Sequence, residues 1–121
     1  MTIQLDPELA KGYFRRAELL LRAEQFDRAL KDIDEAIRLG PELAAAYNIR
    51  GEVHRKMGTP SRAIADLTEA IRLKPTCPDY YRGRAWVYEW VQEDAKAAAD
   101  RAEADRLERS RVADRRGDAA G

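Results

Sequence analysis

The chain has 121 residues, enough for one compact domain or a short array of repeats and too few for two ordinary domains. Its 22 lysines and arginines balance its 22 aspartates and glutamates, so no net field favours nucleic acid or an anionic membrane surface. A single cysteine, Cys77, and a single histidine exclude an internal disulfide and disfavour a Cys/His metal site, and we expect neither metal nor cofactor.

The first predicted elements are two helices, over about residues 7–24 and from Asp27 to Gly40. Asp6 followed by Pro7 is a favourable N-cap and first-turn pair, and Asp27 takes the N-cap position before the second helix. Each helix keeps its apolar or small residues on one stripe. These residues are Leu9, Tyr13, Ala17 and Leu20 in the first helix, and Ala29, Leu30, Ile33, Ala36 and Ile37 in the second. Gly40-Pro41 then ends the second helix.

The same plan continues along the chain, with no strand predicted. A helix over about residues 42–57 is followed by a Gly58-Thr59 break, and Pro60 begins a helix that ends at Leu73. Thr59 and Ser61 are interpreted as caps. Thr76 with Asp79 three residues later resembles a capping box that opens a third pair of helices. The last helix is alanine-rich with charges on all sides, and we expect it to continue to about Arg115.

These elements repeat with a period of 34 residues. Residues 10–43 and 44–77 are identical at 13 of 34 positions, and 44–77 and 78–111 at 10, where about two or three are expected by chance. Recurring polar and aromatic positions are Tyr13, Tyr47 and Tyr81, then Arg16, Arg50 and Arg84, then Asp32, Asp66 and Asp100. Recurring small positions are Ala17, Gly51 and Ala85, then Ala29, Ala63 and Ala97. Small residues let paired helices approach closely while the tyrosine rings fill the space beside them, and neighbouring hairpins must stack to bury both stripes.

This pattern resembles the tetratricopeptide repeat, which has an aromatic residue, a small residue four positions later, then alanines and a closing proline. Its positions here are Tyr13, Ala17, Ala29, Ala36 and Pro41; Tyr47, Gly51, Ala63, Ala70 and Pro75; and Tyr81, Ala85, Ala97 and Ala104. The resemblance covers about residues 7–111 and implies an all-α fold, a right-handed α-solenoid of three antiparallel helix hairpins with repeats at about 10–43, 44–77 and 78–111. We therefore expect one domain over residues 1–116, ending in an extended polar helix, and a flexible tail over residues 117–121.

The sequence departs from the family pattern in two ways. Arg16, Arg50 and Arg84 replace the family's leucine before the small residue, and we expect their alkyl stems on the core and their guanidinium groups at its edge. In the third unit Arg101 replaces an apolar residue, and Arg109 stands where a closing proline is expected. The last helix is therefore expected either to cap the array with its own polar face or to dock on a second chain.

The resemblance also implies a concave groove lined by the first helix of each hairpin, and with it a non-catalytic scaffold or adaptor that binds a peptide or helix of another protein. The matching positions are Lys11, Phe14, Glu18 and Leu21; Ala45, Asn48, Glu52 and Arg55; and Asp79, Arg82, Trp86 and Glu89. Phe14, Trp86 and Trp90 are candidate aromatic anchors, although the two tryptophans could instead pack under the last helix. Two alternatives stay open: a self-associating module that dimerises or stacks through its terminal helix, and a regulatory subunit of an enzyme. The expected state is a monomer or a weak homodimer.

Other functions find little support in the residues. His54 takes the inward position held by Leu20 and Tyr88, so we interpret it as packed, and with no glycine-rich phosphate loop we expect no enzyme. The carboxylate clamp of chaperone-binding family members is not expected here, because the matching positions are Phe14, Glu18, Ile49, Asp79 and Gly83. The arginines between Arg101 and Arg116 alternate with acidic residues, which disfavours nucleic-acid binding. The apolar stretches are too short for a membrane span and the N-terminus lacks a signal peptide's apolar stretch, so we expect no membrane contact and a cytoplasmic location.

Overall fold

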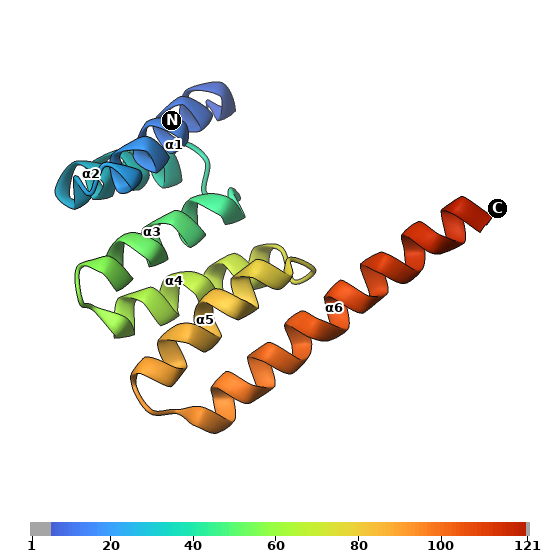
Figure 1. Cartoon of the computed structure of the whole chain (residues 1–121). Coiled ribbons are helices and arrows are strands. Elements are labelled where there is room, and N and C mark those ends of the chain that lie inside the picture. Colours follow the sequence, from blue (N-terminus) through green and yellow to red (C-terminus); the bar gives the residue numbers. More distant parts are fainter. Residues whose placement is uncertain (1–5, 121) are drawn as a thin grey trace.

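Six helices and no strand make up residues 6–120, the part of the chain that this computed structural model describes (Figure 1). They are α1 (Pro7–Arg22), α2 (Phe26–Leu39), α3 (Ala44–Lys56), α4 (Pro60–Leu73), α5 (Pro78–Trp90) and α6 (Asp94–Ala120). Consecutive helices form three hairpins, α1/α2, α3/α4 and α5/α6, and the packing within a hairpin is more extensive than the packing between hairpins. The predicted α-solenoid is therefore confirmed.

Both ends of the described region bear on the predictions. The backbone of α6 is helical as far as Ala120, beyond the expected end near Arg115. The predicted flexible tail, residues 117–121, lies outside the residues whose side chains are described, and Gly121 lies outside the description altogether. Within the described helices, none is long and apolar enough to cross a membrane.

The first helix of each hairpin ends in the same way. Residues 24, 58 and 92, spaced by the repeat period, have positive φ angles of 60°, 80° and 64°. In each case the N–H of the next residue donates to a carbonyl five residues earlier, as Gln25 does to Leu20 at 2.9 Å and Glu93 does to Tyr88 at 2.8 Å. This is a Schellman motif, which satisfies the last carbonyls of the helix. Only Gly58 among the three is a glycine.

Some predicted helix starts are confirmed and others are wrong. The Asp6 side chain accepts hydrogen bonds from the Glu8 and Leu9 N–H groups, both at 3.1 Å, which confirms that N-cap. Asp27 is not an N-cap, because α2 begins at Phe26 and Gln25 takes the cap position. The Gln25 N–H closes the Schellman turn of α1, so the same residue ends that turn and takes the cap position of α2.

The predicted capping box of Thr76 and Asp79 is also wrong, since Cys77 takes the cap position of α5 and its side chain makes no capping hydrogen bond. Thr59 does take the cap position of α4, but its hydroxyl donates to the carbonyl of His54 in the last turn of α3 at 3.0 Å and does not cap α4. Ser61 lies within α4. At the starts of α2, α4 and α5 the cap residue makes no side-chain hydrogen bond to the helix that follows.

The core lies between the helices and is built on small residues. Ala17, Ala29, Ala63 and Ala97 are fully buried, as the repeat predicted. Gly51 shows how close the helices come, because a Cβ there would lie 3.2 Å from Leu67 Cγ and 3.3 Å from the Ala63 carbonyl oxygen. The tyrosines at the repeated position are half-buried at the edge of this core.

An arginine and an aspartate join the two helices of every hairpin. Each arginine donates from Nε and Nη2 to both carboxylate oxygens of an aspartate 16 residues later, at 3.0 and 2.8 Å for Arg50 and Asp66 and at 2.8 Å twice for Arg84 and Asp100. Arg16 and Asp32 pair in the same way. Each guanidinium group also lies over the ring of the repeated tyrosine, with 5.5 to 5.9 Å from Cζ to the ring centroid. The expected arginine position at the core edge is confirmed, and the buried aspartates are its partners.

Candidate partner-binding groove

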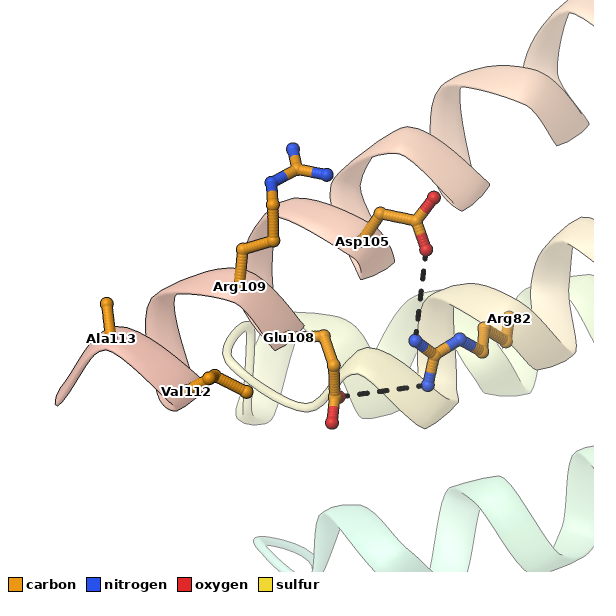
Figure 2. Close-up of a pocket in the computed structure, with 6 residues that line it drawn as sticks. All are labelled: Arg82, Asp105, Glu108, Arg109, Val112 and Ala113. Atoms are coloured by element: carbon orange, nitrogen blue, oxygen red, sulfur yellow. Dashed lines mark ion pairs between the residues drawn. The ribbon is translucent and has the colours of Figure 1, made fainter. Parts of the chain in front are cut away.

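Three hollows lie along the first helices of the hairpins. The first, of about 510 Å³, lies over α1 and α3, and the second, of about 410 Å³, lies over α3 and α5. Asn48, Glu52 and Arg55 line both. The third, of about 490 Å³, lies between α5 and the second half of α6, and Arg82 lines both it and the second hollow (Figure 2). Neighbouring hollows share lining residues and follow one another from α1 to α6, and together they are named the groove.

Trp86 and Arg55 form the centre of this groove. The Arg55 guanidinium carbon lies 4.6 Å from the centroid of the Trp86 ring, a cation–π contact that joins α3 to α5. Trp86 is 49% exposed, and its ring also packs against Trp90 at 6.0 Å between centroids. Neither tryptophan is buried under the last helix. Trp86 therefore presents a large apolar surface that the arginine holds in place.

The structure brings most of the predicted groove residues together and separates four of them, Lys11, Phe14, Ala45 and Glu89. Those lining the three hollows are Glu18, Leu21, Asn48, Glu52, Arg55, Asp79, Arg82 and Trp86. Lys11 lies instead in a hollow at the start of α1 and pairs with Glu8 at 3.6 Å. Phe14 is half-buried against the core of the first hairpin, so it is not the exposed anchor that was expected. Glu89 pairs with Arg101 of α6.

The sequence missed the residues of α6 that close the end of the groove. Figure 2 shows Asp105 and Glu108 directed from α6 towards Arg82 of α5, at 3.9 Å in both ion pairs. Arg109, Val112 and Ala113 continue this wall. The repeat pattern assigns no groove residue to the second helix of a hairpin. Asp105 lies within the length that α2 and α4 share, and the wall from Glu108 to Ala113 lies in the part of α6 beyond it.

Charges in the groove are mixed. Among the described side chains Arg82 has three carboxylates within 3.5 to 3.9 Å, those of Asp79, Asp105 and Glu108. The pKa of Glu108 is lowered from its usual value, chiefly by the hydrogen bond from Arg111. Arginines outside the groove are paired too, as Arg106 is with Glu103. The groove thus offers both signs of charge around one aromatic surface.

His54 lies behind the groove and is packed, as predicted. Its Nε2 is 3.8 Å from Asp66 Oδ2, and its Nδ1 is 3.4 Å from the Thr59 hydroxyl oxygen. Burial lowers the pKa of the imidazole below its usual 6.5, so the ring is neutral at pH 7. Among the described residues, no group of three or more histidine, cysteine, aspartate or glutamate side chains is placed to hold a metal ion.

A known protein family matches this chain. A family model described as Tetratricopeptide repeat matches residues 14–76 and again residues 50–111. No curated protein sequence matches the chain significantly.

Solved structures resemble it in fold. The crystal structure of MamA superposes with a TM-score of 0.83 at 23% identity, over 88% of this chain and 63% of that one. MamA 41-end from Desulfovibrio magneticus RS-1 gives a TM-score of 0.80 at 22% identity, over 86% of this chain and 59% of that one. The first TPR of Spaghetti (RPAP3), bound to the HSP90 peptide SRMEEVD, gives 0.84 at 17% identity, over 88% of this chain and 85% of that one. The chain thus spans less than two thirds of the MamA chains.

Proposed function

Because this chain belongs to the tetratricopeptide repeat family, a family of protein-interaction modules, we propose that it is a non-catalytic scaffold or adaptor that binds a peptide or helix of a partner protein in its groove. The observation that carries this proposal is the half-exposed Trp86, held by Arg55 in the middle of the groove. A large aromatic side chain that keeps one face open, with its position set by a neighbour, suits a binding anchor.

The lining of the groove defines the partner's chemistry. An apolar side chain of the partner would pack on Trp86, and groups of both charges would meet Glu18, Glu52 and Arg82. The RPAP3 domain in the solved complex holds a peptide of another protein, which supports peptide binding by this fold. We do not expect the carboxylate clamp here, because Ile49 at one of its positions is buried in the core and Gly83 at another has no side chain.

Replacement of Trp86 tests the proposal. The intact chain is used to capture partners from its native lysate, and the affinity of the captured partner is then measured by calorimetry for the wild type and for Trp86→Ala. Loss of the anchor should weaken binding by about 2 kcal/mol, roughly thirtyfold. Arg55→Glu and Arg82→Glu should also weaken the same partner.

Val91→Ala is the matched control, since Val91 is exposed at the end of α5 and lines none of the three groove hollows. A partner whose affinity is the same for wild type, Trp86→Ala and Arg55→Glu would contradict groove binding. Circular dichroism of each variant verifies that the fold is retained.

Self-association through the terminal helix and a role as an enzyme's regulatory subunit are the alternatives. The outer face of α6 does not favour stacking, because it carries Ala98 and Arg101 where α2 carries Leu30 and Ile33. Light scattering at increasing concentration separates self-association from the proposed function: a mass that rises with concentration and falls on substitution of α6 would support the alternative.

A further inference from the structure

One face of α1 is exposed although the same face is covered in the other two hairpins. Its residues follow the helical spacing i, i+3, i+7 and i+10, so they lie on one side of the helix. They are Leu9, Gly12, Arg16 and Leu19, here named the α1 end face, and their equivalents are Leu43, Ala46, Arg50 and Val53 on α3 and Cys77, Tyr80, Arg84 and Val87 on α5. Val53 and Val87 are fully buried in clusters with residues of the preceding helix. Leu9 is 49% and Leu19 is 62% exposed.

Arg16 differs from its equivalents in the same way. Arg50 donates from Nη1 to Asp34 of α2 at 3.1 Å, and Arg84 donates from Nη1 to Thr68 of α4 at 3.2 Å. Asp34 and Thr68 occupy equivalent repeat positions, so each arginine joins its own hairpin to the one before. Among the side chains of residues 6–115, Arg16 hydrogen-bonds to Asp32 alone, and its side chain is 64% exposed, against 26% for Arg50 and 18% for Arg84.

At the opposite end of the solenoid, the outer face of α6 is polar where the equivalent faces of α2 and α4 are apolar. The face of α2 that α3 covers carries Leu30, Ile33, Asp34 and Ile37, and α4 carries Ile64, Leu67, Thr68 and Ile71 at these positions. On α6 they are Ala98, Arg101, Ala102 and Asp105. A polar outer face is what a terminal repeat needs in water. The α1 end face instead keeps leucines and an arginine whose Nη1 has no hydrogen-bond partner among the side chains of residues 6–115.

A second copy stacked in the repeat register does not fit the α1 end face. That register places Leu67 of α4 against residue 83 of α5, where a Cβ would lie 3.4 Å from the leucine. The equivalent contact between copies would bring Arg101 of one chain against Arg15 of the next, and these like charges oppose the contact.

We propose that the α1 end face docks an amphipathic helix of a partner protein, which packs its apolar stripe on Leu9 and Leu19 and places an acidic side chain against Arg16 Nη1. The template is the chain's own packing of α2 on α3, where Asp34 supplies that carboxylate. This site is separate from the groove and does not depend on what the groove binds.

A helix-stabilised peptide with the α2 sequence, residues 26–39, is the probe. It is titrated into the isotope-labelled full-length chain, and binding is followed by NMR chemical shifts. We expect saturable shifts at Leu9, Gly12 and Leu19 and at the Arg16 side chain. A peptide with Asp34→Lys should bind at least about tenfold more weakly, because the charged hydrogen bond is replaced by repulsion.

Two chain variants make the test specific. Leu19→Glu should weaken peptide binding about tenfold or more. The fold should be unaffected, since the Leu19 side chain is exposed. Trp86→Ala should leave peptide affinity unchanged, which separates this site from the groove. The proposal is overturned if no chemical shift changes up to about 1 mM peptide, because the dissociation constant would then exceed about 1 mM, a binding free energy weaker than about 4 kcal/mol. Equal affinity for the two peptides, shifts confined to the groove, or a concentration-dependent dimer that Leu19→Glu abolishes would overturn it equally.

Discussion

Arg50 connects three helices through one guanidinium group. It binds both carboxylate oxygens of Asp66 on α4 and one oxygen of Asp34 on α2. Because Asp66 is buried, Arg50→Ala leaves its carboxylate without its two arginine hydrogen bonds, with only the neutral His54 ring nearby at 3.8 Å. We expect the free energy of unfolding to fall by about 3 kcal/mol, measured by denaturant titration with circular dichroism.

Two further variants give this prediction its controls. Arg38→Ala removes an exposed pair with Glu35 and should change stability little. Arg50→Leu combined with Asp66→Leu removes both charges together and should recover most of the loss. A loss for Arg38→Ala as large as that for Arg50→Ala would show that burial of the aspartate is not the cause.

His54 makes stability depend on pH near neutrality. Its pKa is lowered in the fold by burial, so below pH 6.5 the unfolded chain takes up a proton that the folded chain does not. The free energy of unfolding should therefore fall as the pH drops from 7.5 through 6.5 towards 5. Asp34, Asp66, Arg50 and Arg62 are the charged groups that act on the ring.

Replacement of the histidine isolates this effect. In His54→Leu, which copies the residue at position 20, stability should be nearly flat between pH 7.5 and 5. The arginine partners of Glu35, Glu69 and Glu103 lower the pKa values of these carboxyl groups below 4.5. These groups therefore change the free energy of unfolding only at more acid pH. The same slope in both proteins between pH 7.5 and 5 would assign the pH dependence to other groups.

At the scale of one helix, the Schellman turns test how much backbone conformation contributes to stability. Gly58 has a φ of 80° and open space around its missing Cβ, so Gly58→Ala acts on the backbone alone. We expect the free energy of unfolding to fall by about 1 kcal/mol, because the left-handed conformation is unfavourable for an L-residue with a side chain. Thermal and denaturant unfolding both measure it.

Gly12→Ala is the matched control for Gly58→Ala. Gly12 lies within α1, also has open space at its Cβ, and has no positive φ. There the alanine should raise the free energy of unfolding by roughly 0.5–1 kcal/mol through helix propensity. Effects of the same sign at the two glycines would disprove this account of the turn.

Which helices form was predictable, and where some of them begin was not. Stripes of apolar residues at helical spacing predicted the first two helices, and the 34-residue repeat predicted the other four and the small residues between them. Asp27 and Thr76 were misassigned because side-chain caps are a local signal, whereas α2 and α5 start where the preceding turn and the packing of the hairpin allow. The recurring arginines and aspartates were visible in the sequence, but their spacing of 16 residues becomes a contact only once the hairpin is closed.

At the scale of the whole molecule, the second half of α6 is expected to matter for binding more than for stability. Side chains from Arg109 to Arg115 are all exposed, yet Arg109, Val112 and Ala113 line the last hollow of the groove. A chain that ends at Glu108 should therefore lose less than about 0.5 kcal/mol of stability. It should bind the groove partner several-fold more weakly, as measured by calorimetry.

Comparison of the two losses decides between the roles of α6. If truncation strongly lowers the melting temperature, the segment supports the fold and not the groove. If affinity is unchanged while the truncated chain stays folded, the partner does not reach the third hollow. The variant Val112→Ala, which removes the one large apolar side chain of this wall, locates the contact more narrowly.

The sequence by itself determined the repeat, the all-α class and the packing positions, because residues of the same size return at the same helical phase every 34 residues and only stacked hairpins bury them. The tertiary structure alone decided that Trp86 lies open in the groove beside Arg55, that Phe14 packs on the core, and that Leu9 and Leu19 of the α1 end face are exposed. These outcomes depend on which neighbour stands against each helix face, and a helical pattern specifies a face without specifying what covers it.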